Sequence, residues 1–124
     1  MDIDVFQRNI DATRDTLGEG VLSINIWNIE TGLILAEWQG NETAVALLTE
    51  MLDSLRELLK GTVGVTSAAG DHLSMSLKDN KALVIINHGN SMMQGWLLDS
   101  SKVKPGVVLG MALPNAIKNL SSLG

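Results

Sequence analysis

The chain has 124 residues, of which 45% are hydrophobic and 19% are charged, so we expect one folded domain over residues 1–124 rather than a disordered chain. Its net charge of −5 argues against nucleic-acid binding and against adhesion to an anionic membrane, because both need clustered Lys and Arg. Cysteine is absent, which excludes disulfides, thiolate nucleophiles and cysteine zinc sites. This composition favours an interaction domain over an enzyme.

Neither a signal peptide nor a membrane span is predicted. The N-terminal residues 1–5 are acidic and lack the basic and apolar parts of a signal peptide. The longest uncharged stretch runs from Ala82 to Leu98, and a predicted turn at residues 88–90 interrupts it. We therefore expect a cytoplasmic protein that does not insert into a membrane.

The first predicted element is a helix over residues 3–17. Its apolar stripe recurs every three or four residues and consists of Ile3, Phe6, Ile10, Thr13 and Leu17. Gly18 and Gly20 are expected to end this helix, because glycine tolerates the left-handed conformation that closes it.

A hairpin is predicted next. Apolar and polar residues alternate from Val21 to Trp27, which is typical of a half-buried strand. Residues 30–32 form a turn that ends in glycine, and Leu33 to Trp38 is the returning strand. Asn41 is then placed to cap the following helix.

Residues 42–60 carry the clearest helical pattern of the chain. The apolar residues of this segment fall within a sector of about 160° on a helical wheel, which is wider than the roughly 100° needed to rest on one sheet. Either one flank of this stripe meets a second subunit, or the whole helix is deeply seated in one subunit. The width of the stripe supports both interpretations equally.

A loop over residues 61–70 and three strands are expected after this helix. In the first strand, residues 72–78, Leu73, Met75 and Leu77 should point inward. After a turn at residues 79–81, the apolar run 82–86 suits an interior strand covered on both faces. A turn at residues 88–90 leads to the last strand, residues 91–99.

The C-terminal segment is predicted to be a helix that opens at Pro105, whose fixed φ suits a first helical turn. Pro114 lies inside it and should produce a kink or a break into two short helices. The element order is therefore α-β-β-α-β-β-β-α, an α+β fold in which short turns make neighbouring strands antiparallel. The long helix should cross one face of the sheet, and the first and last helices should cover the other.

Few residues of the chain suggest catalysis. There is no phosphate-binding loop and no nucleophile elbow. His72 and His88 should lie near each other at one end of a hairpin, and with Asp71 they form a conceivable metal site. Histidines beside turns are more often solvated, and a metal needs further ligands. We therefore predict no catalytic residue, no cofactor and no metal.

The tryptophans and methionines each allow two interpretations. Trp27 and Trp38 could anchor a partner protein, but we favour positions beneath the flanking helices, since both faces of the sheet should be covered. The methionines could form an adaptable binding surface, although methionine more often fills gaps in a core; those concerned are Met51, Met75, Met92 and Met93.

The hairpin over residues 21–36 resembles the opening strand pair of the roadblock/dynein light-chain family. That family has a polar turn ending in glycine, here Gly32, followed by an apolar strand and then a long amphipathic helix. The similarity continues through the strands at residues 82–86 and 93–98 and through the terminal helix. It rests on pattern and element order over most of the chain.

The resemblance implies a five-stranded antiparallel sheet and a non-enzymatic homodimer. Two copies would join through the strand after the long helix and through that helix, which makes one continuous sheet of both. The implied interface consists of Leu47, Met51, Ser54, Leu58, Leu73, Ser74, Met75, Ser76 and Leu77. The implied partner is a Ras-like small GTPase or a motility or signalling complex. No residue is carried over as a GTPase-activating group.

Two other functions remain open. The chain could be a small-molecule sensor of a related α/β type, with residues 61–70 as a lid over a ligand pocket. An enzyme that uses His72, His88 and Asp71 ranks last.

Overall fold

A computed structural model describes residues 3–63, 72–88 and 91–120 of the chain. The predicted order of helices and strands is confirmed, and the last helix is divided into three consecutive segments. The elements are α1 (Ile3–Leu17), the short 3-10 turn η1 (Gly18–Gly20), β1 (Val21–Asn28), β2 (Ile34–Trp38), α2 (Glu42–Val63), β3 (His72–Leu77), β4 (Lys81–Asn87), β5 (Met92–Asp99), α3 (Pro105–Val107), η2 (Val108–Ala112) and α4 (Leu113–Leu120).

The strands form one five-stranded antiparallel sheet in the order β2-β1-β5-β4-β3. The strand β4 lies between β5 and β3, and the prediction that residues 82–86 are covered on both faces is confirmed for Val84, Ile85 and Ile86, which are buried, whereas Ala82 and Leu83 are half-buried. The two edges of the sheet are β2 and β3.

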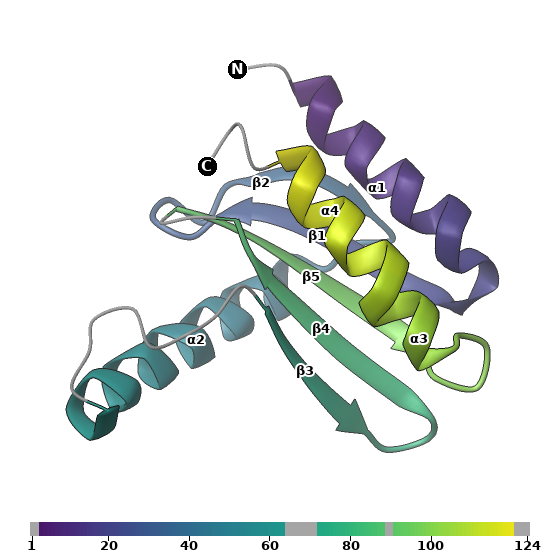
Figure 1. Cartoon of the computed structure of the whole chain (residues 1–124). Helices are drawn as coiled ribbons and strands as arrows, with labels where there is room; N and C mark the ends of the chain where they lie inside the picture. The colour runs from purple at the N-terminus through teal and green to yellow at the C-terminus, as the bar shows by residue number, and fades with distance from the viewer. Residues whose placement is uncertain (1–2, 64–71, 89–90, 121–124) are drawn as a thin grey trace.

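Helices cover the sheet from both sides. Figure 1 shows α1 and α4 on one face and α2 on the other, as predicted. Side chains at alternate strand positions supply the two faces. Ile26 and Trp96 belong to the cluster beneath α1 and α4, whereas the neighbouring Trp27 and Met93 pack with Val45 of α2.

Two tight turns follow the predicted chemistry. Gly32 has φ +75°, a conformation that side chains rarely adopt, and it leads into β2. In the turn between β3 and β4, Asp79 and Asn80 have φ of 62° and 58°. Asp and Asn tolerate this left-handed region better than other residues with side chains, so they can close the tight turn of residues 78–80 between the paired residues Leu77 and Lys81.

The helix α2 is longer than predicted. It runs to Val63 instead of ending at residue 60, and Gly61 lies inside it, which a helix tolerates at a cost of about 1 kcal/mol. The start is as predicted, since the backbone N–H of Ala44 donates to Oδ1 of Asn41 over 3.0 Å. The rest of the predicted loop, residues 64–70, lies outside the described residues.

Pro114 does disturb the last helix, but through a wide turn ahead of the proline. In η2 the N–H of Leu113 donates to the carbonyl of Val108, five residues earlier, which is the spacing of a π-helix. Because proline has no N–H, the regular ladder cannot continue through this position. The wide turn accommodates that gap, and α4 then continues to Leu120.

Candidate functional site

The strand β3 is an open edge of the sheet. It pairs with β4 alone, and all six of its residues, His72–Leu77, are exposed. The expectation that Leu73, Met75 and Leu77 point inward was wrong in one respect. They occupy one face of the strand, yet 38%, 43% and 39% of their surfaces remain accessible. An edge strand buries its side chains only where a helix covers it, and these side chains remain uncovered.

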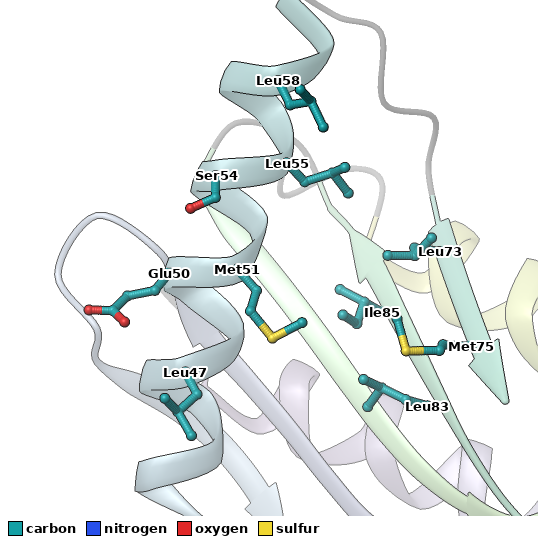
Figure 2. Close-up of a pocket in the computed structure, with 10 residues that line it drawn as sticks. All are labelled: Leu47, Glu50, Met51, Ser54, Leu55, Leu58, Leu73, Met75, Leu83 and Ile85. Atoms are coloured by element: carbon teal, nitrogen blue, oxygen red, sulfur yellow. The ribbon is translucent and has the colours of Figure 1, made fainter. Parts of the chain in front are cut away.

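An apolar groove of about 560 Å³ lies between α2 and the strands β3 and β4. Figure 2 shows side chains of α2 and of the two strands directed toward each other across it. The described lining residues are Leu47, Glu50, Met51, Ser54, Leu55, Leu58, Leu73, Met75, Leu83 and Ile85.

The groove brings together most of the residues that we expected at a dimer interface. Leu47, Met51, Ser54 and Leu58 come from α2, and Leu73 and Met75 come from β3. The expected interface residues Ser74 and Ser76 are exposed and alternate onto the opposite face of β3, while Leu77 follows at the end of the strand.

The first half of α2 is anchored to the sheet. Val45 is only 3% exposed and belongs to the cluster around Trp27. The indole Nε1 of Trp27 donates to Oγ1 of Thr49 over 2.9 Å. Gly95 of β5 lies against this indole, and a Cβ at that position would be in close contact with the ring, at 3.4 Å.

Farther along α2, two of the described apolar side chains that line the groove remain accessible. Met51 and Leu58 are 54% and 63% exposed. The groove is therefore open because α2 is held to the sheet by its first half, whereas its second half stands beside β3 without burying it.

The groove is suited to binding an apolar surface. Glu50 and Ser54 are the polar residues among its described lining, and Figure 2 shows both directed away from the strands. The described lining holds no base or nucleophile aimed at a common point, so nothing in it resembles a catalytic arrangement.

The two histidines lie at the same end of the sheet, as predicted, because His72 pairs with Ile86 and His88 follows two residues later. Asp71, the third member of the conceivable site, lies outside the described residues. The expectation of solvated histidines was wrong for His88, which is 6% exposed. Burial lowers the pKa of His88 from 6.5 to about 4. Across the described residues, no three His, Asp or Glu side chains gather as metal ligands would.

The interpretation of the tryptophans is confirmed for Trp27, which is fully buried. Trp38 is half-buried, and the guanidinium of Arg14 lies 4.1 Å from the centre of its ring. The methionines divide into two kinds: Met92 and Met93 fill the core, whereas the groove holds the other two, Met51 and Met75.

Sequence reasoning missed the floor of the groove, formed by Leu83 and Ile85 of β4. Leu83 pairs with Met75 and Ile85 pairs with Leu73 across the hairpin. These pairs follow only if the count starts from Asp79 as the centre of a three-residue connection, residues 78–80, and the sequence does not indicate that centre; opposed residues of an antiparallel ladder then share a face.

No family model and no curated protein matches the chain. Solved structures do match its fold. MglB from Myxococcus xanthus superposes with a TM-score of 0.82 at 10% identity, over 98% of this chain and 89% of that one. The gliding protein MglB from Thermus thermophilus gives 0.73 at 15% identity, over 96% and 90%. A Roadblock/LC7 domain from Streptomyces avermitilis gives 0.61 at 12% identity, over 88% and 91%.

The chain thus has the roadblock-type fold that its sequence pattern resembles. At these identities the likeness concerns the fold alone. Among the described residues, none of the helices combines the length and the apolar composition that crossing a bilayer requires.

Proposed function

We propose that this chain, residues 1–124, is a single-domain, non-catalytic scaffold or regulator that works as a homodimer. Two copies join through their β3 strands and through the groove beside them. The observation that carries the proposal is the exposed β3 edge next to an apolar groove that its own helix leaves open.

The backbone supports this assembly. An edge strand presents unpaired N–H and C=O groups on its free side, and an identical antiparallel strand satisfies them. The six residues of β3 contain no proline or glycine, so nothing in their sequence prevents such pairing.

The side chains beside that edge also favour a second copy of the chain as the partner. A second copy brings its own exposed Met51, Leu58, Leu73 and Met75 to the groove, and burial of half-exposed apolar side chains favours association. Tight association of a twofold dimer needs a self-complementary surface, and an apolar edge meets this requirement without paired charges.

We further propose that the dimer acts on a Ras-like small GTPase or on a motility or signalling complex in the cytoplasm. This part is supported by the resemblance of the sequence to the roadblock/dynein light-chain family and by the likeness of its fold to a gliding protein. The regulator needs no catalytic group of its own, and the described part of the groove offers none.

Multi-angle light scattering at micromolar concentration tests the dimer. The wild-type chain is expected to elute at twice its 13.3 kDa mass. Met75→Asp should give a monomer, since pairing would bury an uncompensated carboxylate at a cost of several kcal/mol, a weakening of about 100-fold or more.

Met111→Asp is the matched control, because Met111 is similarly exposed but lies on η2, outside the groove. It should remain a dimer. A monomeric wild type, or a Met75→Asp variant that dimerises as well as the wild type, contradicts the proposal. Capture of a GTP-loaded or GDP-loaded small GTPase by the wild type but not by Met75→Asp tests whether the partner needs the dimer.

A small-molecule sensor is the second candidate, and the volume of the groove favours it. About 560 Å³ lies in the range of small-ligand pockets. The described lining predicts an apolar ligand, because it offers few polar groups to orient one. A rise in melting temperature on addition of a medium-chain fatty acid, with no change in the mass of the particle, would favour the sensor over the scaffold.

A further inference from the structure

A cluster of polar side chains is buried on the face of the sheet opposite to the groove. It joins Asn9 of α1, Gln94 and Trp96 of β5, and His88, which follows β4. Their exposed fractions are 2%, 0%, 0% and 6% in that order. We call these four residues the buried polar cluster. The proposed dimer does not use it.

The direction of each hydrogen bond in this cluster follows from Trp96. An indole N–H can only donate, so the atom that it meets must be the carbonyl oxygen Oε1 of Gln94. This places the amide nitrogen Nε2 of Gln94 toward its two other neighbours. It lies 2.9 Å from Oδ1 of Asn9 and 3.3 Å from Nε2 of His88.

An amide NH₂ group carries two hydrogens, and here each has one partner. Both partners must therefore accept. Asn9 accepts through its oxygen, and its own nitrogen donates to the carbonyl of Ala116 in α4 over 3.1 Å. The cluster thus connects β5 with α1 and α4 through bonds whose donors and acceptors are all determined.

His88 must accept at Nε2, so its imidazole is neutral and carries its proton on Nδ1. Burial lowers the pKa of His88 to about 4, which also favours the neutral imidazole. The charged side chains of α1 and α4 are Asp4, Arg8, Asp11, Arg14, Asp15 and Lys118; all are exposed to solvent except Arg14, which is half-buried against Trp38. Glu30 after β1 and His72 of β3 are exposed as well.

We propose that His88 is a proton sensor that acts, through Gln94, on the bond by which Gln94 holds Asn9 and so joins the sheet to the layer formed by α1 and α4. A proton taken from solvent at Nε2 turns this acceptor into a donor that faces the donor Nε2 of Gln94. Gln94 cannot rotate its amide to help, because it would then lose its bonds to Trp96 and Asn9. Protonation therefore favours a state in which the α1 and α4 layer is released from the sheet.

The groove side of the molecule should not respond in the same way. None of the four residues of the buried polar cluster lines the groove or belongs to β3. The two sides of the sheet should therefore respond differently to acid. Acid loosens the layer of α1 and α4, whereas the pairing of β3 with β4 and the groove beside β3 stay unchanged. This inference is independent of whether the chain dimerises.

Nuclear magnetic resonance of the imidazole nitrogens in the intact chain is the first test, and it needs no variant. The expected result is a neutral ring with the proton on Nδ1 at pH 7 and a titration midpoint well below 6.5. A ring protonated on Nε2 at pH 7, or a midpoint at or above 6.5, overturns the proposal.

Amide hydrogen exchange is the second test. Between pH 7 and pH 5, after correction for the intrinsic exchange rate, amides of α1 should lose about twentyfold in protection, the change that linkage gives for a shift from 6.5 to about 4. Amides in the ladder between β3 and β4 that exchange by local opening, without unfolding of the whole chain, should lose much less.

His88→Gln keeps an acceptor oxygen without a titrating ring, and it should abolish the pH-dependent loss in α1. His72→Gln is the matched control at the exposed histidine and should retain it. An acid response of α1 that persists in His88→Gln, or one that is equal in α1 and in the strand ladder, overturns the proposal. If His88→Gln does not fold, the ring measurement on the wild type decides.

Discussion

The two faces of this sheet differ in how completely the helices of the same chain bury their side chains. Beneath α1 and α4, large side chains such as Phe6, Ile10 and Trp96 are fully buried, and the polar groups among them are paired. Beneath α2, the described buried cluster consists of Trp27, Val45, Ile85 and Met93. Beyond this cluster, the apolar side chains of the groove remain accessible to water.

This difference shows that the same sheet can be a closed core on one face and an unsatisfied surface on the other. A face that is complete within one chain contributes stability to that chain. A face left open contributes little until a second molecule covers it, because apolar burial stabilises only when the surface leaves water. We therefore assign stability to the α1 and α4 side, and the α2 side is the one that the proposed dimer would cover.

The largest expected effect comes from truncation on the closed face. Phe6→Ala should lower the free energy of unfolding by about 3–5 kcal/mol, because it removes a fully buried ring and leaves a cavity. Met75→Ala should cost less than about 1 kcal/mol in chains dilute enough to be monomeric, since the side chain is already 43% exposed. Urea denaturation at matched low protein concentration measures both. Equal costs would mean that the two faces are equally closed.

Acid should act next most strongly, and it acts through the closed face. The pKa of His88 is about 4 when folded and 6.5 when unfolded, so the unfolded chain binds more protons and stability falls as the pH drops from about 6.5 toward 4. The loss between pH 7 and pH 5 should be about 2 kcal/mol. His88→Gln should show a correspondingly flatter pH profile of unfolding free energy. Parallel pH profiles for the wild type and His88→Gln would contradict the prediction that His88 lowers stability in acid.

Thr49→Val tests the hydrogen bond that anchors α2 to the sheet next to the groove. It removes the acceptor for the buried indole Nε1 of Trp27, which should cost about 1–2 kcal/mol of unfolding free energy. Thr43→Val, at an exposed position on the same helix, is the control and should change stability by less than about 0.5 kcal/mol. Tryptophan fluorescence during denaturation reports both effects. Equal behaviour of the two variants would show that the bond to Trp27 does not anchor α2.

The smallest predicted effect concerns the first turn of α2. Asn41→Ala removes the bond from the N–H of Ala44 and should cost about 1 kcal/mol, whereas Asn41→Asp keeps an acceptor and should restore most of it. Thermal unfolding followed by circular dichroism measures the difference. A loss as large in Asn41→Asp as in Asn41→Ala would exclude the cap as the cause.

Much of the fold was predictable because its signals are local. The 3.6-residue period of residues 3–17 and 42–60, the two-residue period after Val21 and the turn residues Gly32 and Asp79 each act over a few neighbours. These patterns predicted the element order and the antiparallel pairing. They failed at helix ends, where α2 continues to Val63 through a glycine that a helix tolerates.

The candidate site was predictable in part. Met51 and Met75 were expected at one interface from the resemblance, and the structure places both in one groove. The floor of the groove at Leu83 and Ile85 was missed because it depends on the register of a hairpin. His88 was misjudged because burial is a sum over segments distant in the sequence, and a residue beside a turn gives no local sign of it.

By itself the sequence determined which segments are helices and strands, where the chain turns, that cysteine chemistry is excluded and that the net charge is negative, since these depend on residue type and short-range spacing. Only the tertiary structure decided which apolar side chains stay in water and which polar ones leave it. Leu73 of β3 and Ile86 of β4 are both apolar strand residues. Leu73 is exposed and Ile86 is fully buried, because the exposure of a strand residue depends on which helix packs over it and on how closely that helix approaches the strand.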